Sequence, residues 1–274
     1  MQLQRRLFCG MMAVVLLTAL IIPSAFADTE TRLVRPRIGI FEFFNPTEYQ
    51  DRLLGKRASA AVLNQLSEVD AVRLAAFADV LEACEDMEIE PPFAAGYQQA
   101  VGHRVGAELL LTGVVERCAV HPNSGAVSVD IRITIIDQIT GQPLLSLVAT
   151  AKGRKQEMAP VATDVLVDEA VVRAARKIGE TFENTPLIQT RVRNVAEDKI
   201  VLDTTGVSVP PEVRILIYRG TGVDTENPKL VGVAITAKSD GETTTAQLLG
   251  SANQIYRDDI AVVIEPTLKS DTNR

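Results

Sequence analysis

The sequence predicts an α/β domain with a mixed sheet and packed helices, followed by a small antiparallel β-barrel domain. Up to residue 184, strand patterns alternate with helical ones, as expected where helices cover a sheet. From residue 185 on, the pattern is nearly pure strand, in short runs separated by Gly, Asp, Asn and Pro. We therefore expect an α/β domain at 28–184, an all-β domain at 185–266 and a polar tail at 267–274.

The first domain opens on a strand and a helix. The apolar run within Arg35–Phe44 predicts a strand, which the Asn45-Pro46 turn signal ends. In residues 49–69 the apolar positions recur at helical spacing. The side chains expected to face inward are Leu53, Ala60 or Ala61, Leu63 and Leu66.

A short strand at 71–76 and two helices follow. Residues 77–89 predict the first helix, with Val80, Leu81 and Cys84 or Met87 on one side. We expect Pro91-Pro92 to start the second helix, in the first turn that tolerates proline. Its inward side chains are expected to be Phe93, Tyr97, Ala100 or Val101, and Val105.

The central strand is expected after Gly106, where a left-handed helix cap favours glycine. Leu109–Leu111 run without alternation, which is typical of a strand covered on both faces. After Gly113 apolar and charged residues alternate, so we expect one face of the strand to reach water.

An antiparallel hairpin and a long helix complete the first domain. Alternation over residues 126–138 predicts one strand, Gly141 a turn, and residues 144–153 the returning strand. Met158–Glu183 then predict a helix. Its expected apolar stripe is Val161, Val165, Val172, Ala175, Ile178 and Phe182.

The second domain contains six short strand-like runs. Their spacing favours a small antiparallel barrel or sandwich, of which we expect the barrel. The runs are 187–195, 198–204, 213–220, 230–239, 243–250 and 260–266.

The amino terminus has the layout of a secretory signal peptide. Arg5 and Arg6 precede an apolar core at Met11–Ile22, and Ala25-Phe26-Ala27 is an A-x-A cleavage pattern. The core is shorter than the ~20 residues of a spanning helix, although an uncleaved anchor is the alternative. We expect cleavage after Ala27 and a soluble periplasmic product. Cys9 precedes the apolar core and is not placed to carry a lipid.

The charge balance argues against several partners. Without the leader, 26 basic and 35 acidic residues remain, a net charge of −9. An acidic chain without a dense basic patch is a poor ligand for nucleic acid or anionic lipid. The absence of Trp removes the aromatic platform on which bases and sugars stack.

Two cysteines remain after export, Cys84 and Cys118. An even pair in an oxidising compartment suggests a disulfide. Two buried free thiols are the alternative, because free Cys is among the most buried residue types.

Three stretches of the first domain resemble the TolB amino-terminal-like, or CsgG-type, superfamily. They are "RIGIFEFFNPTE", "AVGHRVGAELLLTGVV" and "VDIRITIIDQITGQPLLS", within residues 35–182. The resemblance implies a mixed sheet with packed helices and a role in the envelope. Members include a curli-secretion protein, activators of peptidoglycan synthases and the middle domain of the flagellar protein FlgT.

The second domain resembles the FlgT carboxy-terminal domain. The matching stretches are "LIQTRVRNVAEDKIVLDTTG", "PEVRILIYRG", "PKLVGVAITAKSDGETTTAQLLG" and "IYRDDIAVV". The pair of resemblances implies a flagellar basal-body or curli-type export role.

For each possible catalytic or ligand-binding motif, a purely structural interpretation of the same residues is favoured. His103 and His121 do not combine with the cysteines at a zinc spacing, and we expect both to be solvated. "LDTTG" at 202–206 has an extra Thr compared with an aspartic-protease motif, so we expect it to close a strand. "RGTGVD" at 219–224 lacks the third glycine of a phosphate-binding loop.

The remaining candidates are equally weak. Ser124 follows His121 closely, but no nucleophile-elbow motif surrounds it. The acidic pairs have no calcium-ligand spacing, so solvated faces are the expectation for Glu85-Asp86, Glu88 with Glu90, and Asp258-Asp259. We expect no catalytic, cofactor-binding or metal-binding residue.

These observations predict a non-enzymatic periplasmic scaffold or assembly protein without a cofactor. Its expected partners are other envelope proteins, with copies of itself in a ring as one arrangement. No later segment is apolar enough to span a bilayer, so peripheral outer-membrane association is the only membrane contact we expect. The alternative is an activator that binds a cell-wall synthase.

Overall fold

The computed structural model describes residues 34–264 except for 122–124, 154–161, 186, 208, 220–227 and 251–253. The leader, its cleavage point after Ala27 and the tail at 267–274 lie outside these residues. Within them, the predicted fold class is confirmed: a mixed sheet with packed helices and a closed six-stranded antiparallel barrel. Among the helices described, none combines the length and apolarity needed to cross a membrane.

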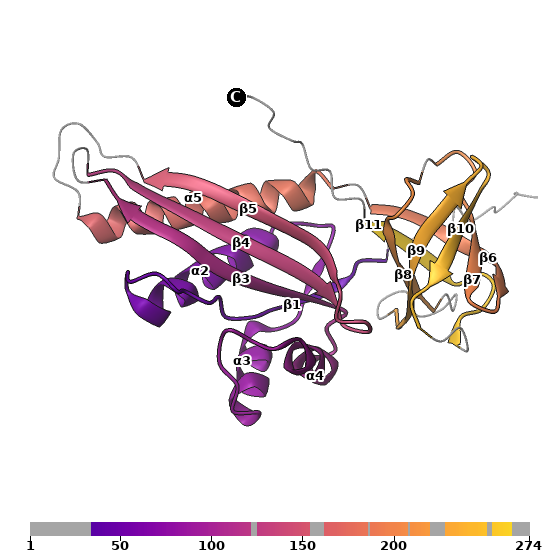
Figure 1. Ribbon diagram of the computed structural model, residues 1–274, viewed down its shortest axis with the longest axis horizontal. Helices are drawn as coiled ribbons and strands as arrows, with labels where there is room; N and C mark the ends of the chain where they lie inside the picture. Colours follow the sequence, from indigo (N-terminus) through magenta and orange to yellow (C-terminus); the bar gives the residue numbers. More distant parts are fainter. Residues whose placement is uncertain are drawn as a thin grey trace, which may run out of the picture. The chain divides into compact units, whose positions relative to one another are not determined.

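The first sheet has five strands in the order β2-β1-β3-β4-β5, of which Figure 1 labels β1, β3, β4 and β5. β1 pairs in parallel with β2 and β3, and β3, β4 and β5 follow as an antiparallel meander. The strands are β1 Arg37–Ile40, β2 Arg73–Leu74, β3 Leu109–Val120, β4 Val127–Asp137 and β5 Pro143–Gly153.

Helices cover both faces of this sheet. α2 (Asp51–Leu66) and α5 (Thr163–Glu183) pack on one face, where Leu109 and Leu111 belong to the same apolar cluster. α3 (Phe77–Asp86) and α4 (Ala95–Val105) pack on the opposite face with Leu110 (Figure 1). The predicted burial of this strand on both sides is therefore confirmed.

The second sheet closes into a barrel in the order β10-β7-β6-β11-β8-β9. The elements are β6 Leu187–Ala196, β7 Lys199–Asp203, β8 Arg214–Tyr218, β9 Leu230–Ser239, β10 Thr243–Leu248 and β11 Ile260–Ile264. Ile215, Ile217, Ala234, Ala261 and Val263 lie in the interior cluster of the barrel.

On one wall of the barrel, side chains of the outer face belong to the apolar core of the first sheet. β11, β8 and β9 are neighbours in the barrel, and side chains alternate between its two faces. Leu216, Tyr218, Val233 and Val262 belong to the apolar cluster of the first sheet. Both sheets lie in one compact unit that begins at Val34, and the barrel also has an apolar cluster of its own.

Two predicted helix faces are corrected. In α2 the buried apolar side chains are Leu54, Ala58, Val62 and Leu66, whereas Leu53 is exposed. In α5, Val165 and Val172 are 57% and 45% exposed. Apolar residues occur all round both helices, so periodicity alone does not select the face that packs. The buried apolar side chains of α5 are Leu166, Val167, Ala170, Val171, Ala174, Ala175, Ile178 and Phe182.

The predicted helix starts are corrected where they can be compared. α4 begins at Ala95, after the cis Pro91-Pro92 bond, and its Tyr97 is exposed. The prolines therefore lie before the helix. α5 begins at Thr163, while Met158 and Val161 lie outside the described residues.

Candidate functional site

A groove of about 540 Å³ lies against α2 and α3, and we call it the α2–α3 groove. Its walls come from α2, from α3, from the segment after β1 and from the segment between α3 and α4. Charged side chains and apolar side chains both line it.

Close packing between α2 and the segment after β1 positions the charged side chains. A Cβ atom on Gly55 would lie 2.1 Å from the carbonyl oxygen of Phe43, so only glycine allows α2 to lie so near. The Phe43 ring in turn lies over Gly113 of β3. This packing brings Arg52 of α2 beside Glu42, the residue before Phe43.

Arg52 joins two carboxylates. Its Nε lies 2.5 Å from Oε1 of Glu42 and its Nη2 lies 3.2 Å from Oε2, so the pair is bidentate. Its Nη1 lies 2.6 Å from Oε1 of the more exposed Glu90. The Glu42 side chain is only 4% exposed, and its hydrogen bonds raise the pKa of Arg52 above the usual range.

The apolar part of the groove comes from α3 and the segment after it. Phe77, Leu81, Ile89 and Phe93 are half-buried and line the floor. Phe93 also packs on Phe41, with 5.0 Å between the ring centroids. These side chains provide an apolar surface next to the Glu42–Arg52 ion pair.

Cys84 also lines the groove, but as a protonated thiol. Burial is the main cause that raises its pKa to about 11, and the charges of Glu42 and Glu85 add to it. Since the thiolate is the nucleophile, a thiol with this pKa is a poor one near pH 7.

The rim of the groove is acidic. Glu85 and Glu88 are exposed, and neither carboxylate forms an ion pair within the described part of the chain. Lys56, one turn after Arg52, lies on the α2 wall. Four carboxylates and two cations therefore line the groove, which leaves an excess of negative charge.

The groove is not among the sites predicted from the sequence. Glu42 stands alone among apolar residues in "RIGIFEFF", and a lone acid in a buried run requires a partner. That signal was available, but it does not say which basic residue pairs with it.

The two cysteines are free in the structure. Cys84 is buried in the cluster with α3 and α4, whereas Cys118 packs against the cluster on the other face of the sheet. The sheet separates the two side chains, and no disulfide joins them in the structure.

The structure does not bring the other sequence candidates together. His103 on α4 and His121 after β3 are both exposed, as expected. Asp203 ends β7 and accepts hydrogen bonds from Thr205, so "LDTTG" does close a strand. In the described residues no three His, Cys, Asp or Glu side chains form a potential metal site.

One acidic prediction is wrong, and two candidates are untested. Asp259, expected on a solvated face, is buried and lies 3.2 Å from Nε of Arg219. Burial of a charge requires such a partner, which lies 40 residues away in the sequence. Ser124 and residues 220–224 lie outside the described residues.

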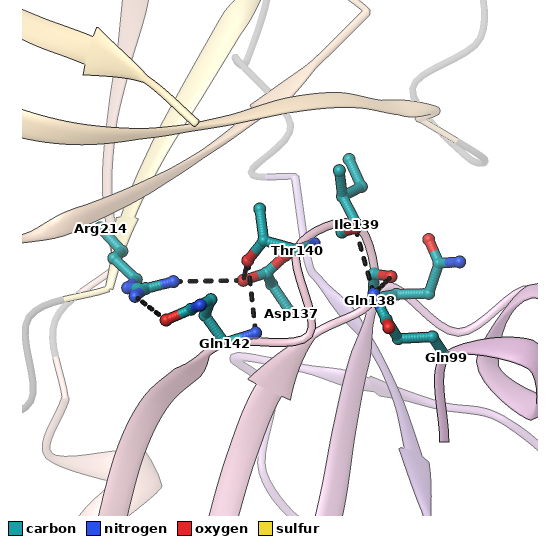
Figure 2. Close-up of polar contacts among 7 residues, drawn as sticks. All are labelled: Gln99, Asp137, Gln138, Ile139, Thr140, Gln142 and Arg214. Atoms are coloured by element: carbon teal, nitrogen blue, oxygen red, sulfur yellow. Dashed lines mark hydrogen bonds and ion pairs between the residues drawn. The ribbon is translucent and has the colours of Figure 1, made fainter. Parts of the chain in front are cut away.

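A second group of polar contacts joins the barrel to the first sheet. Figure 2 shows Arg214 of β8 pointing toward Asp137 and Gln142 at the β4–β5 turn. Asp137 is fully buried and also accepts a 2.6 Å hydrogen bond from the backbone of Thr140. Gln99 of α4 donates to the carbonyls of Gln138 and Ile139, which ties the same turn to α4.

Fold and groove together define an α/β protein with an attached barrel and a mixed-charge groove. No protein-family model matches the chain, and no curated protein matches it.

Several solved structures are similar to part of this chain. The PelC dodecamer from Paraburkholderia phytofirmans is 18% identical over 52% of this chain and 87% of its own, with a TM-score of 0.33. Lipoprotein GNA1162 from Neisseria meningitidis is 17% identical over 53% and 99%, with a TM-score of 0.38. The LpoB C-terminal domain from Salmonella enterica is 12% identical over 44% and 85%, with a TM-score of 0.31. At these scores the likenesses carry no functional argument.

Proposed function

We propose that this chain is a non-enzymatic protein of the cell envelope that acts by binding other envelope proteins. The observation that carries the proposal is the α2–α3 groove. Its buried carboxylate, Glu42, is held in a bidentate pair by Arg52 beside an apolar floor. Apolar surface next to satisfied charges is typical of a protein-binding surface.

The protonation states in the groove support binding over catalysis. A general acid or base works best with a pKa near the operating pH. Arg52 is held as a cation, and the Cys84 thiol, with a pKa of about 11, is held protonated. Neither histidine lines the groove. These groups are suited to positioning a partner and poorly suited to proton transfer.

The finer assignment follows from the sequence. The leader with Arg5, Arg6 and the Ala25-Phe26-Ala27 pattern supports export to the periplasm. The stretches that resemble the TolB amino-terminal-like superfamily and the FlgT carboxy-terminal domain support a scaffold for a flagellar basal body or a curli-type export system. Activation of a cell-wall synthase is the second candidate, because the same superfamily contains such activators.

Crosslinking in living cells tests the proposal. A photoreactive amino acid replaces Leu81 on the groove floor in the full chain, and a second variant carries it at exposed Val172 of α5. We expect an adduct with an envelope protein, or with a second copy, from position 81 and little from position 172. Mass spectrometry of the adduct separates a flagellar or curli component from a synthase. A folded, exported chain that gives no protein adduct at position 81 contradicts the proposal.

A further inference from the structure

We propose that the α2–α3 groove binds a basic segment of a partner protein, with an apolar side chain on the floor and an Arg or Lys at the rim. This inference rests on the proposed function and names the chemistry of the partner. Three features carry it: the charge of the rim, the pairing of Glu42 with Arg52 in the interior and the apolar side chains that line the groove.

The rim is complementary to a cation. Glu85 and Glu88 are exposed and form no ion pair with any residue that the structure describes. Their neighbour Asp86 differs, because it pairs with Arg104. Two unpaired carboxylates at the edge of a groove attract a basic side chain and disfavour an acidic one, which gives specificity to the encounter.

The interior is suited to an apolar side chain. Placing an apolar group against a buried Glu42 without a partner would be costly, because that group would exclude the water that solvates the charge. Arg52 removes that penalty by pairing with Glu42 through two hydrogen bonds. Its third contact, with Glu90, also holds the segment that carries Ile89 and Phe93 against the groove.

The same arrangement disfavours a free small cation as the occupant. Such a ligand would bind best to an unpaired carboxylate inside the groove. The interior carboxylate, Glu42, is already paired, and the unpaired ones lie outside at the rim. A chain that places an apolar residue inside and a basic residue outside satisfies both regions at once.

Matched charge reversals test the inference. The test variant is Glu85→Lys with Glu88→Lys, and the control is Glu68→Lys with Glu82→Lys, which changes the charge equally at exposed positions outside the groove. The probe is a fluorescein-labelled twelve-residue peptide of alternating Leu and Arg, read by fluorescence anisotropy at low salt. A peptide with Glu in place of Arg is the comparison.

We expect the Leu/Arg peptide to bind the wild-type chain and the control with affinities within about twofold, and the test variant about tenfold more weakly, a change of ~1.4 kcal/mol. The Glu peptide should not bind. Equal binding to the test variant and the control would overturn the inference, as would binding of spermidine with displacement of the peptide.

The location of binding is read from Cys84. In the full chain with Cys9→Ser and Cys118→Ser, the Leu/Arg peptide should slow maleimide alkylation of Cys84, which lines the groove. Unchanged alkylation at a saturating peptide concentration would also overturn the inference. The crosslink at position 81 separates the two claims. If an adduct forms there but its partner segment lacks basic residues, this inference fails while the proposed function stands.

Discussion

The hydroxyl of Tyr218 on β8 donates a 3.1 Å hydrogen bond to the carboxylate of Glu108, 110 positions earlier in the chain. The backbone N–H of Arg37 donates to the same carboxylate at 2.7 Å, and Nη2 of Arg73 lies 3.9 Å away. Tyr218 and Glu108 are both buried. The bond therefore joins the barrel to the segment that enters the central strand of the first sheet.

Tyr218→Phe should destabilise the chain by about 1–3 kcal/mol, because it removes one donor from a buried carboxylate. Urea unfolding measures the difference. Tyr97→Phe is the control, since Tyr97 is exposed and the change should stay within ~0.5 kcal/mol. Equal losses in the two variants would show that the bond to Glu108 contributes nothing.

Glu108 should make stability fall as pH rises. Burial raises its pKa above the usual 4.5, against the opposing effects of Arg37, Tyr218 and Arg73. Below pH 4.5 both the folded and the unfolded chain hold the proton. As the pH rises above 4.5, Glu108 loses its proton in the unfolded chain before it does in the folded chain. The free energy of unfolding therefore falls until the pH exceeds the pKa of Glu108 in the folded chain.

Glu108→Gln removes this titration and keeps an acceptor for Tyr218. The stability of the variant relative to wild type should therefore increase from pH 4.5 upward, as measured by urea unfolding at several pH values. A difference between the two proteins that does not change with pH would contradict the prediction.

Arg214 and Asp137 should be energetically coupled. Asp137 is fully buried, and Nη1 of Arg214 lies 3.3 Å from its Oδ2. Arg214→Leu should cost about 1–3 kcal/mol by leaving the carboxylate with fewer partners. In a double-mutant cycle with Asp137→Asn, the loss should be at least ~0.5 kcal/mol smaller than the sum of the single losses. Additive losses would show that the pair does not link the barrel to the β4–β5 turn.

Gly113→Ala should destabilise the chain by about 1–3 kcal/mol, because its Cβ would lie 2.5 Å from the Phe43 ring. Gly96→Ala is the matched control: a Cβ there meets no atom within 4 Å, and α4 should gain up to ~1 kcal/mol. Thermal unfolding of both variants measures the contrast. If Gly113→Ala left the stability unchanged, the close packing of the Phe43 ring on Gly113 would not require a glycine.

Both thiols should be free in the isolated protein. In the Cys9→Ser chain, denatured without reductant, two equivalents of a thiol reagent should react. In the folded chain Cys84 should react slowly at pH 7, because its pKa of about 11 leaves little thiolate. No reaction before reduction, followed by two equivalents after it, would establish the Cys84–Cys118 bridge instead.

Local patterns predicted the elements of this fold well. Leu109–Leu111 form an unbroken apolar run, and both faces of that strand are buried. The six runs after residue 185 correspond to the six barrel strands. In the second domain "RILIY" and "IAVVI" do not alternate, which is typical of strands that are covered on both faces.

The spacing of apolar residues was less informative about which face of a helix is buried. Val165 and Val172 fit a helical stripe as well as Val167 and Val171 do, and only the second pair is buried. A helix with apolar residues on several sides has no preferred face until another surface selects one.

The sequence by itself determined where strands and helices occur, because the spacing of apolar residues and the conformational limits of Gly and Pro act within a few residues. The tertiary structure alone decided that Arg52 neutralises Glu42 and that Tyr218 reaches Glu108. Pairing of buried polar groups depends on which surfaces meet, and a carboxylate in the sequence carries no record of the distant side chain that will satisfy it.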